Sequence, residues 1–198
     1  MHIFGNLGHS VILAPLSLIL IFYLLSIGAR RDALAFAVAL IACLTVTLLS
    51  KLFFGVCGAR APDLHIESPS GHESFSGVVY GCLAVLLATG RPKALQALIY
   101  ATAALLFVLI GVGRVASRAH TPEEVAVGLL IGVGAAALFR SLRGQAGPFP
   151  VPWRALAFLS PFALAFGFVA LLAARNWTPE YFIEAVGQRL GAHFGVCI

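Results

Sequence analysis

Six long apolar stretches constrain the fold of this chain more than any other feature of its sequence. Each has about 17 to 22 residues, which is the length that an α-helix needs to cross the hydrocarbon of a bilayer. Only 11% of the residues are charged, against about 25% in an ordinary soluble domain. The sequence therefore predicts an all-α fold, a six-transmembrane-helix bundle that forms a single domain over residues 1–198. The expected spans are residues 11–27, 33–49, 73–89, 94–111, 122–139 and 153–174.

The charged residues between these stretches predict how the bundle lies in the membrane. With six spans, the connections after the first, third and fifth stretches share one side, and Asp32 is their only acid. The other acids all fall on the second side, so only the first side is plainly basic. Because cytoplasmic loops carry an excess of Lys and Arg, we expect the first side to be cytoplasmic. Arg30 and Arg31 follow the first stretch instead of preceding it, which is the reverse of a signal peptide.

The basic residues stand singly between apolar runs, which is typical of membrane loops and excludes a nucleic-acid-binding face. The tail, residues 175–198, has the apolar spacing of a short amphipathic helix on the outer interface, and a frayed terminus fits it equally well. Cys43 and Cys82 lie inside apolar runs and are expected to be buried. Cys57 and Cys197 fall on the same expected side, so a disulfide between them stays open, although nothing fixes their spacing.

Polar residues collect in two segments on the expected outer side, residues 51–72 and 113–124. Both adjoin the membrane on the same side, so they can meet across the bundle. Lys51, Arg60 and Arg114 are the basic residues that matter here. One such residue at a membrane boundary is usually a snorkelling anchor. Three of them near two histidines and two helix starts favour a site that holds an oxyanion.

The first segment ends in Ser70, Gly71, His72 and Glu73, directly before an apolar run. Ser70 and Glu73 are three residues apart, which is a capping-box pattern. A helix start also offers unpaired N–H groups and a positive dipole to an anion. Gly71 would allow the backbone to approach a phosphate closely, and His72 on the first turn would be able to donate a proton. Capping and anion binding by this segment are therefore compatible.

The second segment ends in Thr121, Pro122 and Glu124, which again mark a helix start. Glu124 is therefore either a capping carboxylate or the partner of His120, which lies just before the cap. A carboxylate on one ring nitrogen of a histidine fixes its tautomer and makes the other nitrogen a better nucleophile or base. The spacing alone does not decide whether Glu124 reaches His120.

Together these motifs resemble the type 2 phosphatidic acid phosphatase superfamily. Pro69-Ser70-Gly71-His72 matches its Pro-Ser-Gly-His motif in full. Arg114, five residues, His120, three residues and Glu124 match the spacing of its Ser-Arg-x5-His-x3-Asp motif. The pattern of six apolar stretches extends the resemblance from about residue 11 to residue 174.

The chain departs from the family pattern at three places. The first family motif is Lys-x6-Arg-Pro, whereas Lys51 and Arg60 have a longer spacer and Ala61 follows the arginine. In the third motif a glycine replaces Ser, and Glu124 replaces Asp. A literal Ser-Arg pair ends at Arg118, but counting onward from it places a glutamate where the nucleophilic histidine belongs. Arg114 is therefore the arginine that matches the motif.

The resemblance implies a role for each of these residues. His120 would attack phosphorus and form a phosphohistidine, while Glu124 orients it and His72 protonates the leaving oxygen and later helps to activate water. The groups that would hold the phosphoryl oxygens are Lys51, Arg60, Arg114 and the backbone at Ser70 and Gly71. No cofactor or metal is expected, and the run Asp63-x-His65-x-Glu67 does not by itself converge on an ion.

The expected function is hydrolysis of a membrane lipid phosphate or diphosphate, with undecaprenyl diphosphate favoured. The site would face the outside of a bacterial inner membrane. We expect short outer loops and no second domain that could hold a large headgroup. Two alternatives stay open: a lipid phosphotransferase of the same fold with an isoprenyl diphosphate donor, and a non-catalytic lipid-binding or transport member. The sequence does not indicate an oligomeric state.

Overall fold

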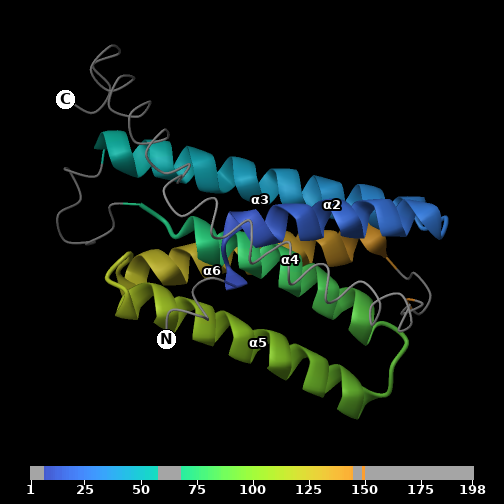
Figure 1. Ribbon diagram of the computed structural model, residues 1–198. Coiled ribbons are helices and arrows are strands. Elements are labelled where there is room, and N and C mark those ends of the chain that lie inside the picture. The colour runs from blue at the N-terminus through green and yellow to red at the C-terminus, as the bar shows by residue number, and fades with distance from the viewer. Residues whose placement is uncertain (1–6, 58–67, 145–148, 150–198) are drawn as a thin grey trace.

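The computed structural model describes residues 7–57, 68–144 and 149, and within them the chain forms five helices and no strand. Figure 1 shows them as an elongated bundle in which the helices run side by side. Their bounds are α2 Ser10–Ser26, α3 Arg30–Cys57, α4 Gly71–Ala88, α5 Lys93–Ala116 and α6 Pro122–Arg143. The described part of the chain is therefore all-α, as the sequence predicts.

The five helices correspond to the first five expected spans. By length and composition, α3, α4, α5 and α6 each suffice to cross a membrane, and α2 is a shorter apolar helix of 17 residues. The sixth expected span, residues 153–174, lies outside the described residues, and so do the tail from 175 onward and the partner proposed for Cys57. The count of six spans and the side of the membrane that the site faces therefore stay predictions.

Three helices run further than the sequence predicts: α3, α5 and α6, the last of which ends at Arg143 and not at residue 139. The helix α3 continues past residue 49 to Cys57, so Lys51 lies on a helix and not in a loop. Likewise α5 continues to Ala116, which places Arg114 in its last turn. The residues after Lys51 are mostly apolar, and a single lysine does not end a helix because its long stem packs as an apolar chain. Both basic residues are thereby held on rigid elements.

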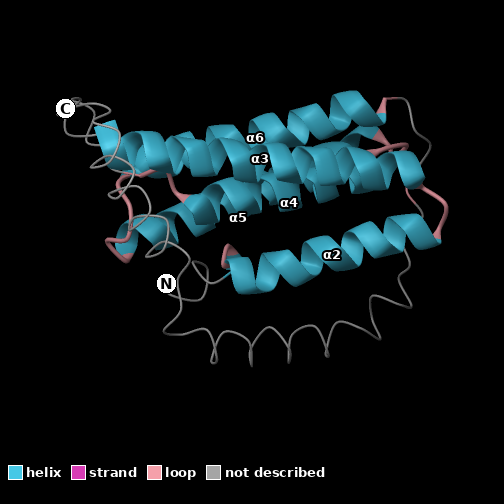
Figure 2. Ribbon diagram, turned by 90° about the horizontal axis from the view of Figure 1, so that it is seen from above, coloured by secondary structure: helices cyan, strands magenta, loops and turns pink. Residues whose placement is uncertain are grey.

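The central helix of the bundle is α4, which contacts α2, α3, α5 and α6. It lies between α3 and α5 in Figure 1, and Figure 2 shows the bundle from above. Most α4 side chains are buried, whereas its neighbours expose large apolar side chains such as Leu34, Leu105 and Leu130. Exposed apolar faces of this extent suit contact with lipid rather than water.

Glycines let α6 approach α4 at backbone distance. A Cβ on Gly132 would lie 2.5 Å from the carbonyl oxygen of Ser74, and one on Gly77 would lie 2.9 Å from the Gly132 Cα. One turn earlier, a Cβ on Gly128 would lie 2.5 Å from the carbonyl oxygen of Ser70. Small residues at such spacings allow close helix packing in membranes. They bring the first turns of α4 and α6 together, and both polar motifs lie there.

At the other end of the bundle, a buried ion pair joins the start of α3 to the end of α6. Arg143 Nε donates to Asp32 Oδ2 at 3.0 Å. The Arg143 guanidinium also donates to the hydroxyl of Thr89, the residue that follows α4. Arg31 Nε donates to the carbonyl oxygen of Leu142 at 3.1 Å. This pairing accounts for the one acid on the basic side of the sequence pattern.

Candidate active site

Glu124 caps the helix on which it lies. Thr121 is the N-cap of α6, and its hydroxyl accepts from the Glu124 N–H at 3.3 Å. In return, Glu124 Oε2 accepts from the Thr121 N–H at 3.2 Å, and Pro122 opens the helix. The capping box predicted from the sequence is therefore confirmed.

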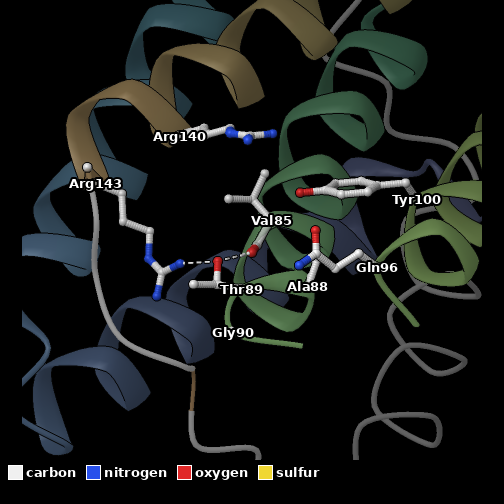
Figure 3. A pocket seen from close by; sticks show the side chains of 9 residues that line it. Val85, Ala88, Thr89, Gly90, Gln96, Tyr100, Arg140 and Arg143 are labelled. Atoms are coloured by element: carbon white, nitrogen blue, oxygen red, sulfur yellow. Dashed lines mark hydrogen bonds between the residues drawn. The ribbon is translucent and has the colours of Figure 1, made fainter. Parts of the chain in front are cut away.

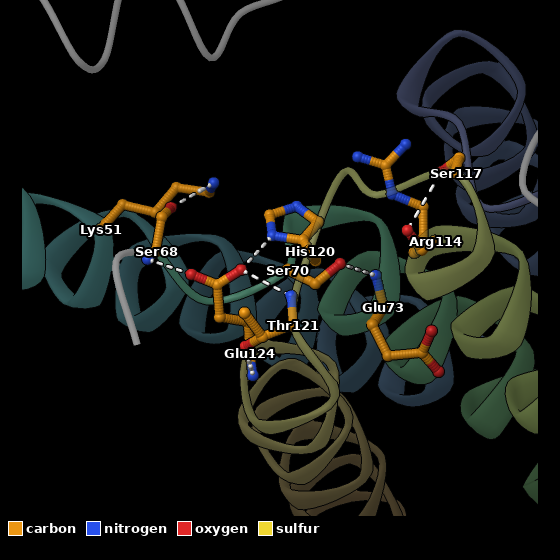
Figure 4. Close-up of polar contacts among 9 residues, drawn as sticks. All are labelled: Lys51, Ser68, Ser70, Glu73, Arg114, Ser117, His120, Thr121 and Glu124. Atoms are coloured by element: carbon orange, nitrogen blue, oxygen red, sulfur yellow. Dashed lines mark hydrogen bonds and ion pairs between the residues drawn. The ribbon is translucent and has the colours of Figure 1, made fainter. Parts of the chain in front are cut away.

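The same carboxylate also binds His120, so the two interpretations of Glu124 hold together. His120 Nδ1 lies 2.8 Å from Glu124 Oε2, and both side chains are almost fully buried. Glu124 Oε1 accepts from the Ser68 N–H at 2.7 Å (Figure 4). With Glu124 ionised, His120 is the donor in their contact, so the lone pair of the ring lies on Nε2. One carboxylate thus contacts both His120 and the segment before α4.

Ser70 is held firmly at the start of α4. Its N–H donates to the backbone oxygen of Glu124 at 3.1 Å, its hydroxyl accepts from the Glu73 N–H at 3.4 Å, and the residue is fully buried. The backbone N–H of Ser70 is therefore already hydrogen-bonded within the protein. The next residue, Gly71, is the first residue of α4, and N–H groups at this position have no partner within their own helix. Ser70 therefore holds the start of α4 in place against α6.

The expected reciprocal bond from Glu73 does not form. Glu73 is completely buried, and neither carboxylate oxygen has a hydrogen-bond partner among the described residues. Its carboxylate lies beside Gly111 of α5, where an added Cβ would lie 3.5 Å from Oε2. The first loop thus supplies the N-cap of a capping box but not its second half, because the close packing of three helices turns the Glu73 side chain inward.

Lys51 and Arg114 place basic groups around the same turns. Lys51 Nζ donates to the Ser68 hydroxyl at 2.9 Å, and its Cε would lie 3.4 Å from a Cβ on Gly71. Figure 4 shows Lys51 and Arg114 extending on opposite sides of His120, from α3 and from the last turn of α5. Arg60 lies outside the described residues. The longer spacing of the first motif does not keep Lys51 away from the Pro-Ser-Gly-His turn.

A second histidine contact was not expected from the sequence. His72 lies on the first turn of α4, and its ring meets that of His9 edge-on, with centroids 5.1 Å apart. His9 is the N-cap of α2, where its Nδ1 accepts from the next turn. The Tyr80 hydroxyl holds the preceding segment by donating to the Leu7 carbonyl at 2.9 Å. A lone histidine ahead of an apolar run gives no sequence signal for this contact.

The Ser-Arg pair at residues 117 and 118 has a structural role. Arg118 has a φ of 55°, in the left-handed region that follows many helix ends. Its N–H donates to the Val115 carbonyl, and the Ala119 N–H donates to the Arg114 carbonyl. These two bonds are those of a Schellman motif closing α5. Arg118 therefore ends a helix, which agrees with Arg114 being the arginine of the motif.

The family comparison matches most of the region just described. The model of the PAP2 superfamily, the type 2 phosphatidic acid phosphatases, matches residues 32–148. This chain belongs to the PAP2 superfamily. The matched segment runs from α3 through α6 and includes every residue that the motifs single out, whereas His9 lies before it. Members of this superfamily are generally phosphatases, so membership supports phosphatase activity without naming a substrate.

One curated relative is similar over much of the chain. It is the "Uncharacterized 22.5 kDa protein in cps region" of Klebsiella pneumoniae, 29% identical over 138 residues. The match covers 69% of this chain and 66% of the relative, just under two thirds of its length. No solved structure matches significantly. The name of the relative states no substrate, so the chemistry has to be argued from the PAP2 motifs themselves.

The arrangement of these motifs suits acyl or phosphoryl transfer through histidine. A histidine held by a carboxylate is the arrangement of an activated nucleophile or base. Two helix starts and two basic side chains surround it, and such groups stabilise a developing negative charge. Among the described residues, no group of three or more His, Cys, Asp or Glu side chains is placed to hold a metal ion.

Proposed function

We propose that this PAP2 protein hydrolyses a membrane lipid phosphate or diphosphate without a metal, through a phosphohistidine at His120. The observation that carries this proposal is the double contact of Glu124. Its carboxylate lies 2.8 Å from His120 Nδ1 and accepts from the Ser68 N–H at 2.7 Å. A purely capping glutamate would need neither contact. Through them, the nucleophile of one motif is held in register with the phosphate-binding turn of the other.

In the first step, His120 Nε2 attacks phosphorus and a P–N bond forms. The bond from phosphorus to the leaving lipid oxygen breaks, and His72 gives that oxygen a proton. Glu124 stabilises the positive charge that His120 acquires, because its carboxylate is nearly buried and poorly screened. Splitting the transfer in two is nucleophilic catalysis, and the geometry keeps the attacking nitrogen in the required tautomer.

In the second step, water attacks the phosphohistidine and gives its proton to His72. The P–N bond breaks, inorganic phosphate leaves, and both histidines return to their starting states. His72 thus acts first as acid and then as base. A bell-shaped pH profile is expected, since His120 has to be unprotonated and His72 protonated at the start.

The developing charge on phosphorus is balanced by cations and amides. Lys51 and Arg114 extend around His120 from two different helices. Gly71 is the first residue of α4, so its N–H lies at the positive end of the helix dipole. Arg60 is proposed as a further ligand from the family motif alone. Fixed donors of this kind need no reorganisation during the reaction.

The proposed substrate is a lipid because the site lies at one end of a bundle of apolar helices. The helix α4 leads from the Pro-Ser-Gly-His turn into a membrane-spanning segment, so a phosphate bound there sits near the membrane surface. An isoprenyl or acyl chain would then remain in the bilayer beside the helices. Within this class we favour undecaprenyl diphosphate, with the site on the periplasmic side of a bacterial inner membrane.

The test is phosphate release by the purified protein in detergent with EDTA present. Undecaprenyl diphosphate, phosphatidate and phosphatidylglycerol phosphate are compared for wild type, His120→Ala and His193→Ala, the last being a histidine outside the motifs. We expect release that survives EDTA, is lost in His120→Ala and persists in His193→Ala. Full activity in His120→Ala would contradict the mechanism. Phosphate gain by an added acceptor lipid, without release, would identify a phosphotransferase instead.

A further inference from the structure

A polar pocket lies at the opposite end of the bundle from His120. It has a volume of about 230 Å³ and lies between the end of α4, the start of α5 and the end of α6 (Figure 3). The helix α4 has 18 residues and is therefore about 27 Å long at 1.5 Å per residue. That length is close to the hydrocarbon thickness of a bilayer. The pocket and the proposed catalytic site therefore face opposite surfaces of the membrane. Its described lining residues are Val85, Ala88, Thr89, Gly90, Gln96, Tyr100, Arg140, Arg143 and Gly144.

The two arginines of the pocket differ in their state. Arg143 is 3% exposed and is already neutralised by Asp32. Arg140 is exposed, and no described residue pairs with its guanidinium. The described lining contains no carboxylate at all. The described residues of the pocket therefore retain one net positive charge that no other described residue compensates.

A second donor faces the same hollow. Figure 3 shows the Tyr100 hydroxyl of α5 and the Arg140 guanidinium of α6 directed across the pocket toward each other's helix. No described residue is hydrogen-bonded to this hydroxyl. Gln96 of α5 also lines the pocket, and its amide nitrogen donates to the Arg91 carbonyl at 2.8 Å. A cation and a hydroxyl on separate helices thus converge on one open volume.

An anchoring role alone does not account for Arg140. A basic residue in the last turn of a helix offsets the helix dipole, and a snorkelling side chain extends outward to water. Arg140 instead extends sideways over Val85, toward α5 (Figure 3). It lies over a hollow that Thr89, Gln96 and Tyr100 also line.

We propose that this pocket binds the phosphate group of an anionic ligand, through Arg140 and Tyr100. A guanidinium offers several donors in one plane and binds phosphate well, and phosphate is the anion that phospholipid headgroups present at a membrane surface. Ligand pockets for whole drug-sized molecules have about 300 to 1,000 Å³, so a smaller pocket suits a headgroup phosphate and not an entire lipid. Two sources share this chemistry: an anionic phospholipid of the adjacent leaflet, and free phosphate.

The test is lipid binding by native mass spectrometry of the detergent-solubilised full chain. Phosphatidylglycerol is the probe, because its phosphodiester has no terminal phosphate for a phosphatase to remove, and phosphatidylcholine is the zwitterionic comparison. Arg140→Gln is expected to weaken phosphatidylglycerol binding at least fivefold, and Tyr100→Phe to weaken it less. Lys93→Gln is the matched control, since it removes an exposed cation at the same end of the bundle but outside the pocket.

Inorganic phosphate separates the two sources. If millimolar phosphate displaces phosphatidylglycerol from wild type, the pocket binds the free anion as well; if it does not, the ligand is a lipid headgroup. Either result supports the site provided that Arg140→Gln, and not Lys93→Gln, weakens binding. Equal binding by Arg140→Gln and wild type would overturn the proposal. So would equal losses in both variants, or equal affinity for phosphatidylcholine, because these would show unspecific attraction to the membrane surface.

Discussion

The carboxylate of Glu124 can be tested by changing it to an amide of the same shape. The carboxylate of Glu124 now faces three groups that can donate to it: the His120 ring and the Thr121 N–H on one side, and the Ser68 N–H on the other. In Glu124→Gln, the NH₂ group has to face one of these two sides. If it faces His120, the ring takes the other tautomer and Nε2 carries a proton. If it faces Ser68, the correct tautomer survives, but the charge that stabilises the positive histidine is lost. Both orientations should weaken His120 as the proposed nucleophile.

The expected loss is large and separable from stability. In serine proteases, the corresponding change from carboxylate to amide lowers kcat by about 10⁴. We expect kcat to fall by roughly 10² to 10⁴ here, which corresponds to about 3 to 5 kcal/mol of transition-state stabilisation. The lost charged hydrogen bonds should also cost about 2 kcal/mol of folding free energy. The assay is the initial rate of phosphate release in detergent, at a temperature where thermal unfolding shows the variant to be folded.

Glu123→Gln is the matched control for this experiment. Glu123 is the adjacent acid on the first turn of α6 and is exposed. Losing its charge removes only its interaction with the helix dipole, about 0.3 to 1 kcal/mol. Its kcat should stay within about twofold of wild type. A folded Glu124→Gln protein with kcat within threefold of wild type would refute the reasoning, because Glu124 would then be a helix cap and nothing more.

Three further predictions follow from local geometry. Arg118→Gly should raise the melting temperature and leave activity unchanged, because Arg118 has a φ of 55°. The folding free energy should gain about 1 kcal/mol, since glycine adopts this backbone conformation without strain. A lower melting temperature would contradict the capping role of Arg118. Gly128→Ala should lower the free energy of unfolding by about 1 to 3 kcal/mol, because its Cβ would meet a backbone oxygen at 2.5 Å. The measurement is thermal unfolding in detergent, and Gly134→Ala, which has open space around its Cβ, should be tolerated. His9→Asn retains an N-cap side chain but removes the ring against His72; it should lower kcat roughly tenfold for an alkyl phosphate and little for nitrophenyl phosphate, and equal losses on both would contradict a link to leaving-group protonation.

The first five apolar stretches predict the described helices well, because length and composition decide which segments can enter a bilayer. Helix ends were harder to predict. The polar residues Lys51 and Arg114 predict helix boundaries, yet α3 and α5 continue through them. Inside a bundle, a basic side chain can lie on a helix whenever its charged end reaches a polar partner, as Lys51 reaches the Ser68 hydroxyl. Hydropathy predicts whether a segment prefers lipid or water, but it does not predict which residue of another helix a polar side chain will contact.

For the candidate site, sequence reasoning found the residues that belong to motifs and missed those that only packing brings in. Spacing indicated Glu124 both as a cap and as a partner of His120, but could not show that one carboxylate reaches both. Glu73 was expected to close a second capping box and is buried without a partner among the described residues. His9 meets His72 only because the segment before α2 packs onto α4. Contacts of this kind depend on tertiary structure, which spacing along one chain does not report.

The family motif has Asp where this chain has Glu124, and the structure suggests a reason why the longer side chain is useful here. At the third position of α6, one oxygen of Glu124 accepts from both Thr121 and His120, while the other reaches across to the N–H of Ser68. A side chain one methylene shorter would have less reach toward the segment before α4. The close packing of Gly128 against Ser70 brings that segment within range. The helix start, the tautomer of the proposed nucleophile and the position of the proposed phosphate-binding turn therefore depend on one carboxylate. Changes that loosen α4 against α6 should impair catalysis before they unfold the protein.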